Sequence, residues 1–261
     1  MNTIFALAGI VIKELYRRKD FYVLFVITAV ITLIMASVNV FQEGKIVRYL
    51  KDICLLLIWI SSLAIAIGTA ARQIPAERES RTIFPLLAKP VSRWQVIVGK
   101  FLGCWLACGI ALVVFYLFFG VVSGAKEGSW PILQYFQAFW LQWAMLGVVV
   151  AMVLLGSVLF SAPSANATIC LVALTGIFVL GSHLHKLAGT QPAPLAILLS
   201  VIYFLMPHLE WFYAARERLV FEQGLIGWGD CGLATLYVAA YVGLFLFLTW
   251  LIFRRKILTT G

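Results

Sequence analysis

Charged residues are scarce in this 261-residue chain. They make up 12% of it, against roughly 25% in an average soluble domain. The scarcity is concentrated, because six runs contain no charged residue at all: 21–42, 53–71, 101–125, 128–185, 187–209 and 231–253. A membrane-spanning helix needs about 20 such residues. These absences exclude an ordinary water-soluble fold and predict an all-α, polytopic membrane protein.

Nucleotide-binding and catalytic motifs are also missing. There is no G-x-x-x-x-G-K-[ST] phosphate loop, since the Gly99–Lys100 pair lacks both the earlier glycine and a following Ser or Thr. No Ser–His–Asp or H-E-x-x-H arrangement appears. His208 and Glu210 could form an acid–base pair, but the aromatic residues that follow them, 211–213, are typical of a membrane anchor. We expect no catalysis by this chain alone.

Metal-binding patterns are absent as well. The five cysteines follow no metal spacing, and Cys104 and Cys108 are interpreted as small packing residues. His183 and His185 are two residues apart, so a helix would point them in different directions. We therefore expect no metal and no other cofactor in this chain.

Positive charge does not precede the first apolar stretch, as it would in a signal peptide. Lys13, Arg17, Arg18 and Lys19 follow it instead. Apolar residues recur at helical spacing through this stretch (Ile4, Leu7, Val11 and Leu15). Residues 1–20 are therefore predicted to form an interfacial amphipathic helix that leads into the first span.

The distribution of charge predicts the topology. Spans are expected near 21–41, 53–71, 101–123, 138–161, 167–187 and 232–253. If both termini are cytoplasmic, the inner segments hold 13 of the 20 Lys and Arg and 4 of the 11 acids. Positive residues stay on the cytoplasmic side, so this orientation in a prokaryotic inner membrane is favoured. The basic composition then reflects orientation and gives no support to nucleic-acid binding.

The segment 188–231 is expected to lie on the outer side. Gly189, Pro192, Pro194 and Pro207 interrupt its apolar run, which suits re-entrant or interfacial helices better than a seventh span. Further along, Arg216, Glu217 and Arg218 are predicted to form a solvated face. The whole chain, 1–261, is predicted to be a single transmembrane domain.

A polar stretch, "ERESRTIFPLLAKPVSR" (77–93), separates the second and third spans. Burying its six charges in the bilayer would cost about 15–20 kcal/mol, so the segment 72–100 must lie in cytosol or headgroups. Pro75 can open a short helix, Pro90 can stop it, and "SRWQVIVGK" can start the next. Its apolar residues suit either a protein partner or the headgroup layer.

The stretch "ERESRTIFPLLAKPVSRWQVIVGKFLG" (77–103) resembles the cytoplasmic segment between spans two and three of ABC-2-type transporter permeases. Weaker similarity comes from "FLMPHLEWF" (204–212) and the basic end "FRRK". The pattern departs from the family at Ser80–Arg81, where Gly is common, and at Pro85, which interrupts the short helix. The resemblance implies a coupling helix that contacts an ATPase mainly through residues 74–93, with these contact positions: Glu77, Arg78, Glu79, Arg81, Thr82, Phe84, Leu86, Leu87, Pro90 and Arg93.

The resemblance also implies partners and a function. ATP and Mg would bind two separate ATPase subunits, and a second permease copy, identical or similar, would complete a dimer in membrane lipid. The chain would couple ATP hydrolysis to export of an unidentified substrate. Two alternatives stay open: a mechanical subunit that transports nothing and acts on an extracytoplasmic partner, and a membrane enzyme or scaffold.

Small and hydroxyl residues complete the candidate set. A small-residue stripe in span three (Gly99, Gly103, Ala107 and Ala111) would allow close helix packing, inside the subunit or at a dimer seam. Hydroxyl residues at membrane depth are pathway candidates, although most such groups bond to their own helix: Thr28, Thr32, Ser61, Ser62, Thr69 and Thr175. No charged residue falls mid-span, which argues against an ion-coupled carrier.

Overall fold

The computed structural model describes residues 2–17, 19–37, 43–79, 92–188, 195, 197, 200, 201, 203, 206–221 and 224–256. These residues form helices and short connections and contain no β-strand. The helices are α1 (Asn2–Arg17), α2 (Lys19–Ser37), α3 (Glu43–Ala70), α4 (Pro75–Glu79), α6 (Arg93–Glu127), α7 (Ile132–Leu159), α8 (Pro163–Ala188), α10 (Leu209–Phe221) and α11 (Trp228–Lys256).

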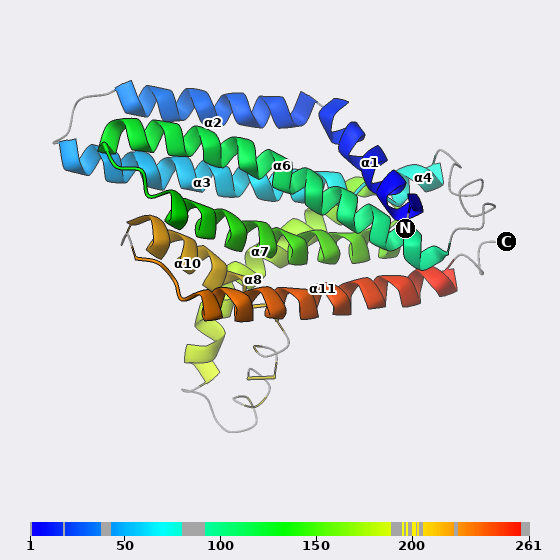
Figure 1. The fold of residues 1–261 in the computed structure, drawn as a ribbon. Helices are drawn as coiled ribbons and strands as arrows, with labels where there is room; N and C mark the ends of the chain where they lie inside the picture. The colour runs from blue at the N-terminus through cyan, green and yellow to red at the C-terminus, as the bar shows by residue number, and fades with distance from the viewer. Residues whose placement is uncertain are drawn as a thin grey trace.

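The long helices lie side by side along one axis (Figure 1). The start of α1, the short α4, the start of α6 and the end of α11 lie together, and we call this the terminal end of the bundle. The opposite end contains the start of α3, the end of α6 and the start of α11. Because the first and last helices reach the same end, the chain crosses the bundle an even number of times.

Four helices in the described part of the chain are long and apolar enough to cross a membrane: Val47–Glu77, Arg93–Glu127, Ile132–Leu159 and Trp228–Arg255. The helices α2 and α8 carry shorter apolar stretches, Phe21–Ile34 and Pro163–Val179. The protein is thus a multi-pass membrane protein. The six expected spans correspond to α2, α3, α6, α7, α8 and α11.

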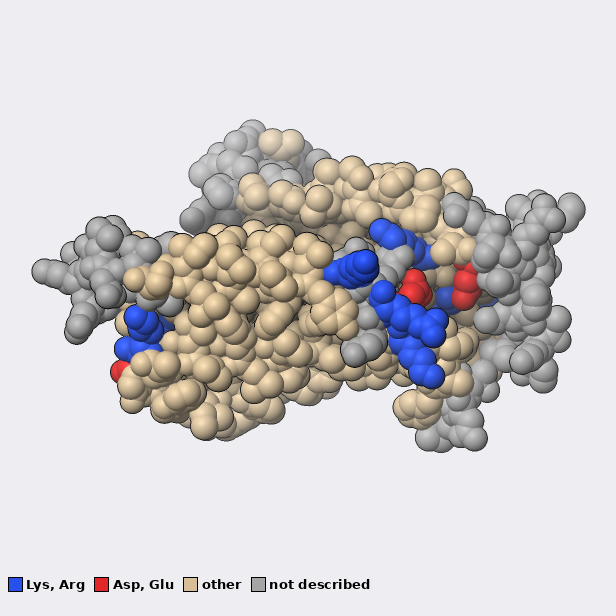
Figure 2. Space-filling view, turned by 90° about the horizontal axis from the view of Figure 1, so that it is seen from above, with Lys and Arg blue, Asp and Glu red and all other residues tan. Residues whose placement is uncertain are grey.

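Exposed tryptophans mark the two ends of the apolar region. Trp130 and Trp228, both more than half exposed, lie at the opposite end, and Trp94 is 42% exposed at the start of α6. Tryptophan concentrates at membrane–water interfaces. In Figure 2, one group of Lys and Arg lies at the left-hand end of the visible face and a larger group lies in its right-hand half, with an uncharged band between them. Both features place the membrane normal along the helices.

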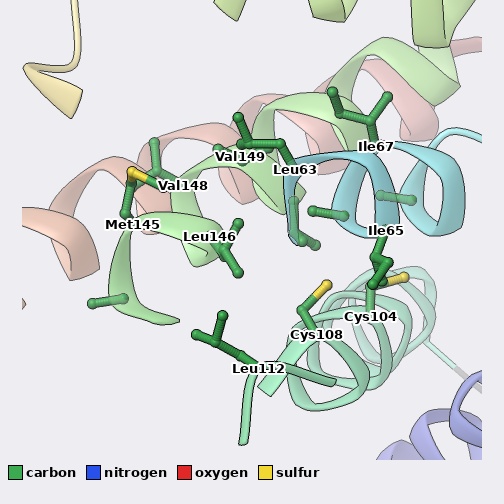
Figure 3. Packing of buried hydrophobic residues seen from close by; sticks show 14 of the residues in the cluster. Leu63, Ile65, Ile67, Cys104, Cys108, Leu112, Met145, Leu146, Val148 and Val149 are labelled. Carbon is green, nitrogen blue, oxygen red and sulfur yellow. The ribbon is translucent and has the colours of Figure 1, made fainter. Parts of the chain in front are cut away.

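The central helix is α7. Every residue from 144 to 151 is buried, as expected for a helix that is apolar on all sides. It packs against α3, α6, α8, α10 and α11. Figure 3 shows side chains of α3, α6 and α7 meeting in this core, among them Leu63, Ile65, Cys104, Cys108, Leu146 and Val149. Cys104 and Cys108 are fully buried apolar packing residues, as predicted.

Two tryptophans clamp α6 to α7. The Trp105 Nε1 donates to the Trp143 carbonyl at 2.9 Å, and the Trp143 Nε1 donates to the Trp105 carbonyl at 3.0 Å. Their rings stack at 4.5 Å. Each indole lies over a glycine of the other helix, so that a Cβ on Gly109 would be 2.6 Å from Trp143 Nε1. The glycines therefore give the rings the space they need.

The ends of α6 follow local rules. Ser92 is its N-cap, and its hydroxyl accepts from the Gln95 N–H while the Gln95 side chain accepts from the Ser92 N–H. This reciprocal pair satisfies two donors that the first turn leaves open. At the other end Gly128 has a φ of 68° and donates to the Gly124 carbonyl, a left-handed cap that favours glycine. The 35 residues between them span about 50 Å, enough to pass beyond the hydrocarbon layer.

Candidate functional site

Within the segment expected to contact an ATPase, the described residues 74–79, 92 and 93 lie at the terminal end (Figure 1). Pro75 opens α4, as the sequence predicted, and Glu77 lies in its first turn. Arg78 and Glu79 belong to α4, and Arg93 opens α6. The remaining six predicted contact positions lie outside the described residues: Arg81, Thr82, Phe84, Leu86, Leu87 and Pro90.

A buried lysine joins α6 to α4. Lys100 is 4% exposed, and its Nζ lies 2.8 Å from Glu77 Oε1. The same Nζ donates to the Gln73 carbonyl at 2.8 Å and to Gln73 Oε1 at 3.4 Å. Gln73 is itself buried, and its Nε2 donates to the Thr69 carbonyl near the end of α3. One ammonium group therefore connects α3, the turn after it, α4 and α6.

This network is costly to break. Taking two charges out of water is repaid only when the pair has good geometry and further hydrogen bonds, and Lys100 has both. Removing one partner of such a pair costs about 3–5 kcal/mol, because the other charge stays buried and uncompensated. The start of the predicted coupling segment is thus held tightly to a spanning helix.

The end of α11 is tied to the same place. The Arg93 guanidinium donates to the Arg254 carbonyl at 2.9 Å, which joins the first residue of α6 to the last turn of α11. The Arg254 guanidinium lies 5.7 Å from the ring centre of Trp250. Three separate parts of the chain, 73–77, 93–100 and 250–254, therefore meet around the terminal end.

The small-residue stripe receives α1. A Cβ on Gly99 would lie 2.9 Å from the Leu7 Cβ, and one on Gly103 would lie 2.7 Å from the Val11 Cβ and 3.0 Å from the Ala8 carbonyl oxygen. Because these approaches involve backbone, only glycine fits. Further along the stripe, Ala107 and Ala111 are buried in the subunit core. The structure thus places this stripe inside the subunit.

Comparison with known proteins identifies the family. The model of the ABC-2 family transporter proteins matches residues 5–256, nearly the whole chain. The chain belongs to the ABC-2 family of transporter permeases. No curated protein sequence matches it significantly. As an ABC-2 permease it is the membrane component of an ABC transporter, and its family implies association with an ABC ATPase subunit.

The hydroxyl residues proposed for a pathway have partners within the permease. Thr28 and Ser61 share a hydrogen bond of 3.3 Å between α2 and α3. Thr32, Thr69 and Thr175 donate to carbonyls of their own helices. Thr175 is exposed. Of these bonds, the Thr28–Ser61 bond joins two helices and the other three stay within one helix.

A buried series of hydrogen bonds joins α6, α7 and α3, and it was not predicted from the sequence. The Tyr116 hydroxyl donates to Gln142 Oε1 at 2.8 Å, and Gln142 Nε2 donates to the Ser62 hydroxyl at 3.0 Å. Ser62 in turn donates to the Trp59 carbonyl. Only Ser62 had been singled out. Gln142 is one of three glutamines in the uncharged run 128–185, and it was the available signal, because a buried amide needs partners.

The prediction that Arg216 lies on a solvated face is wrong. Arg216 is 1% exposed. Its Nη1 donates to the Leu55 carbonyl of α3 at 3.2 Å, and its guanidinium lies 4.7 Å from the ring centre of Tyr213. In the described part of the chain it has no ion-pair partner, and its Nε is buried without a hydrogen bond. Its neighbours on α10 at helical spacing, Phe212 and Leu219, are also buried.

Of the three histidines, only His208 has a described side chain. The backbone N–H of His208 donates to the Tyr237 hydroxyl at 2.8 Å, and the Glu210 carboxylate lies against Gly181 of α8. His183 and His185 belong to α8, and their side chains lie outside the described residues. Among the described side chains no three His, Cys, Asp or Glu come together as metal ligands.

Proposed function

We propose that this permease exports a substrate across a prokaryotic inner membrane, driven by separate ATPase subunits that contact mainly residues 74–93. The terminal end of the bundle is cytoplasmic, the chain crosses the membrane six times, and the segment 188–231 lies on the outer side. The bias of Lys and Arg toward the terminal end and the tryptophans at both edges support this orientation.

The Lys100–Glu77 pair carries the proposal, because it joins a spanning helix directly to the segment that the ATPase contacts. Displacement of α4 is transmitted to α6 through the 2.8 Å Lys100–Glu77 ion pair. It is transmitted to α3 through Gln73, which accepts from Lys100 and donates to the Thr69 carbonyl. Moving α4 away from α6 would separate this pair and leave the buried Lys100 ammonium without its counter-charge, which is unfavourable. The two helices should therefore move together. Motion of the ATPase is thereby passed to two spans at once.

ATP and Mg bind the partner, and two copies of the permease work with two ATPases. The lack of a phosphate loop in the chain supports a separate site of hydrolysis. A single six-span subunit provides one half of a pathway, so a second, identical or similar copy provides the other.

The hydrogen bonds of the interior hydroxyls suit a second candidate function. In the described part of the chain, Thr32 and Thr69 donate to carbonyls of their own helices and Thr28 bonds to Ser61, so these groups do not direct their donors toward a substrate. A permease that transmits force to an extracytoplasmic partner needs no such donors. Transport along a surface between two copies is equally compatible with these bonds.

Co-purification tests the contact with the ATPase. The tagged chain is purified from native membranes, and bound nucleotide-binding subunit is detected by photolabelling with azido-ATP. The substitutions Phe84→Asp and Leu87→Asp replace apolar residues of the expected contact segment with a charge. We expect each to lower the amount of recovered ATPase about tenfold, as loss of a central apolar contact does at interfaces.

Ser129→Asp is the matched control, since Ser129 is exposed at the opposite end of the bundle. This variant should recover as much ATPase as the unmodified chain. Equal recovery with all three variants would place the ATPase contact elsewhere. Nucleotide hydrolysis by the purified chain without any companion would contradict the proposal as a whole.

A further inference from the structure

A cleft of about 610 Å³ lies between α10 and α11. This volume is within the range of sites that hold one small molecule, about 300–1,000 Å³. Its walls are apolar, with Phe212, Ala214 and Ala215 on α10 facing Leu233 and Ala234 on α11. Figure 1 shows the two helices as neighbours at the end of the bundle opposite the termini.

Polar groups lie at the two ends of this α10–α11 cleft. His208 and Tyr237 lie at one end, where the backbone N–H of His208 donates to the Tyr237 hydroxyl at 2.8 Å. Arg218 and Asp230 lie at the other. Arg218 follows His208 by ten residues along α10, which separates the two ends by about 15 Å.

The charged end coincides with the edge of the apolar region. Asp230 lies in the first turn of α11, two residues after Trp228, which is 60% exposed. The same end of the bundle holds exposed Trp130 and the Lys51–Glu127 pair. Tryptophans and paired charges mark the headgroup layer. Thus the cleft has its charged mouth among the headgroups and its apolar floor at the depth of the acyl chains.

We propose that the α10–α11 cleft binds a phospholipid from the outer leaflet, with an acyl chain in the cleft and the headgroup phosphate at Arg218. The guanidinium has five donors and suits a phosphate, while the walls between the two polar ends are mostly apolar, with the indole of Trp211 among them, and suit an acyl chain better than a sugar or a peptide. The choice of leaflet rests on the proposed orientation. Lipid binding itself goes beyond the proposed function and does not depend on it.

Photolabelling tests the site in the intact permease–ATPase complex. The complex is placed in phosphatidylcholine vesicles that contain a trace of phosphatidylglycerol with a diazirine in its acyl chain. After illumination, labelled peptides are identified by mass spectrometry. We expect the strongest labelling at α10 and at the first three turns of α11, above the level on the lipid-facing remainder of α11.

Two alanine-to-phenylalanine variants separate the cleft from the general lipid surface. Ala214 is exposed and lines the cleft, while Ala240 is exposed on α11 and does not. Ala214→Phe should fill the cleft and lower its labelling about fivefold to tenfold, the effect of about 1 kcal/mol or slightly more. Ala240→Phe should leave it unchanged. Both variants should still recover the ATPase, which shows that they fold.

The headgroup is tested with a second probe and a second variant. Arg218→Gln removes the charge, so labelling by phosphatidylglycerol should fall roughly tenfold, as for loss of one charge-assisted hydrogen bond. Labelling by a diacylglycerol with the same diazirine chain should not change. Uniform labelling along α11, or labelling that Ala214→Phe does not reduce, would overturn the proposal. Neither result would alter the recovery of ATPase, so failure here is distinct from failure of the proposed function.

Discussion

Two ion pairs between a buried lysine and a partly exposed glutamate lie at opposite ends of α6, and they join different elements. Lys51 Nζ is 2.6 Å from Glu127 Oε2, and Lys100 Nζ is 2.8 Å from Glu77 Oε1. Both lysine side chains are 5% exposed. The first pair joins the start of α3 to the end of α6, which are two long helices. The second joins α6 to the five-residue α4 and, through Gln73, to the turn after α3.

The same chemistry therefore serves two purposes. At the opposite end the Lys51–Glu127 pair fixes the two long helices α3 and α6 to each other, so its loss should reduce the stability of the fold. At the terminal end the ion pair fixes α6 to the short segment that we propose the ATPase contacts. Its loss should therefore also uncouple ATP hydrolysis from movement of the spanning helices. Stability and coupling can be separated by changing one end at a time.

The largest effect is expected from Lys100→Met. The variant keeps most of the side-chain volume but leaves the Glu77 carboxylate, which is 25% exposed, without the Lys100 cation, at a cost of about 2–3 kcal/mol, below that of a fully buried pair. Stimulation of ATP hydrolysis by the permease in proteoliposomes should fall to near the level of the ATPase alone. Adding Glu77→Gln should recover much of the thermal stability, because the stranded charge is gone, without restoring the stimulation.

Lys51→Met is the matched control at the opposite end. It should lower the unfolding temperature by a similar amount, since Lys51 is as buried as Lys100. The fraction that stays folded should keep normal stimulation of ATP hydrolysis. If Lys51→Met uncoupled as strongly as Lys100→Met, the distinction between the two ends would be lost.

A smaller effect is expected from Gly103→Leu, which acts on the packing of α1 at the terminal end. A side chain there meets Val11 and the backbone of Ala8 within 3.0 Å, and such overpacking costs about 1–3 kcal/mol. The Gly120→Leu substitution lies toward the opposite end, where the nearest atom is 3.8 Å away. Thermal unfolding in detergent should show a loss for Gly103→Leu and almost none for Gly120→Leu.

Arg216 is a third buried cation, and it has no carboxylate partner in the described part of the chain. Replacing a buried charge by an apolar residue of similar size is often neutral or stabilising. We expect Arg216→Met to raise the free energy of unfolding by about 1 kcal/mol, in contrast to both lysine variants. A clear fall in the unfolding temperature would instead show that its bond to the Leu55 carbonyl is strongly stabilising.

The smallest effect is expected from Thr175→Val. Thr175 is exposed and its hydroxyl donates to the Leu171 carbonyl of its own helix. Substitutions of this kind usually change stability by less than about 0.5 kcal/mol. Transport assays and thermal unfolding should both match the unmodified permease, and a large loss of transport alone would return Thr175 to the pathway.

Local features of the fold were predictable from the sequence because they depend on near neighbours. The apolar runs predict the long helices, Pro75 predicts the start of α4, and the restart of a helix at 92–100 agrees with the capping of α6 by Ser92 and Gln95. The expectation of α-helices only, in a multi-pass membrane protein, agrees with the described structure.

Features that depend on distant partners were not predictable. The small-residue stripe indicates close packing, but only the structure shows that α1 fills it. Nothing in the sequence pairs Lys100 with Glu77, or Trp105 with Trp143, since many partners are possible at such separations. Arg216 was misassigned because a run of Arg, Glu and Arg is typical of a wet surface, while its helical spacing with Phe212 and Leu219 marks a buried face.

The most direct measurement is photocrosslinking from a single introduced thiol in the permease–ATPase complex. The five native cysteines are buried, so a benzophenone maleimide should react mainly at the Phe84→Cys or Ser129→Cys position. We predict an adduct with the ATPase from the Phe84→Cys variant and none from the Ser129→Cys variant. An adduct from the Ser129→Cys variant alone would show that the ATPase binds the opposite end, and the account of coupling through Lys100 would be wrong.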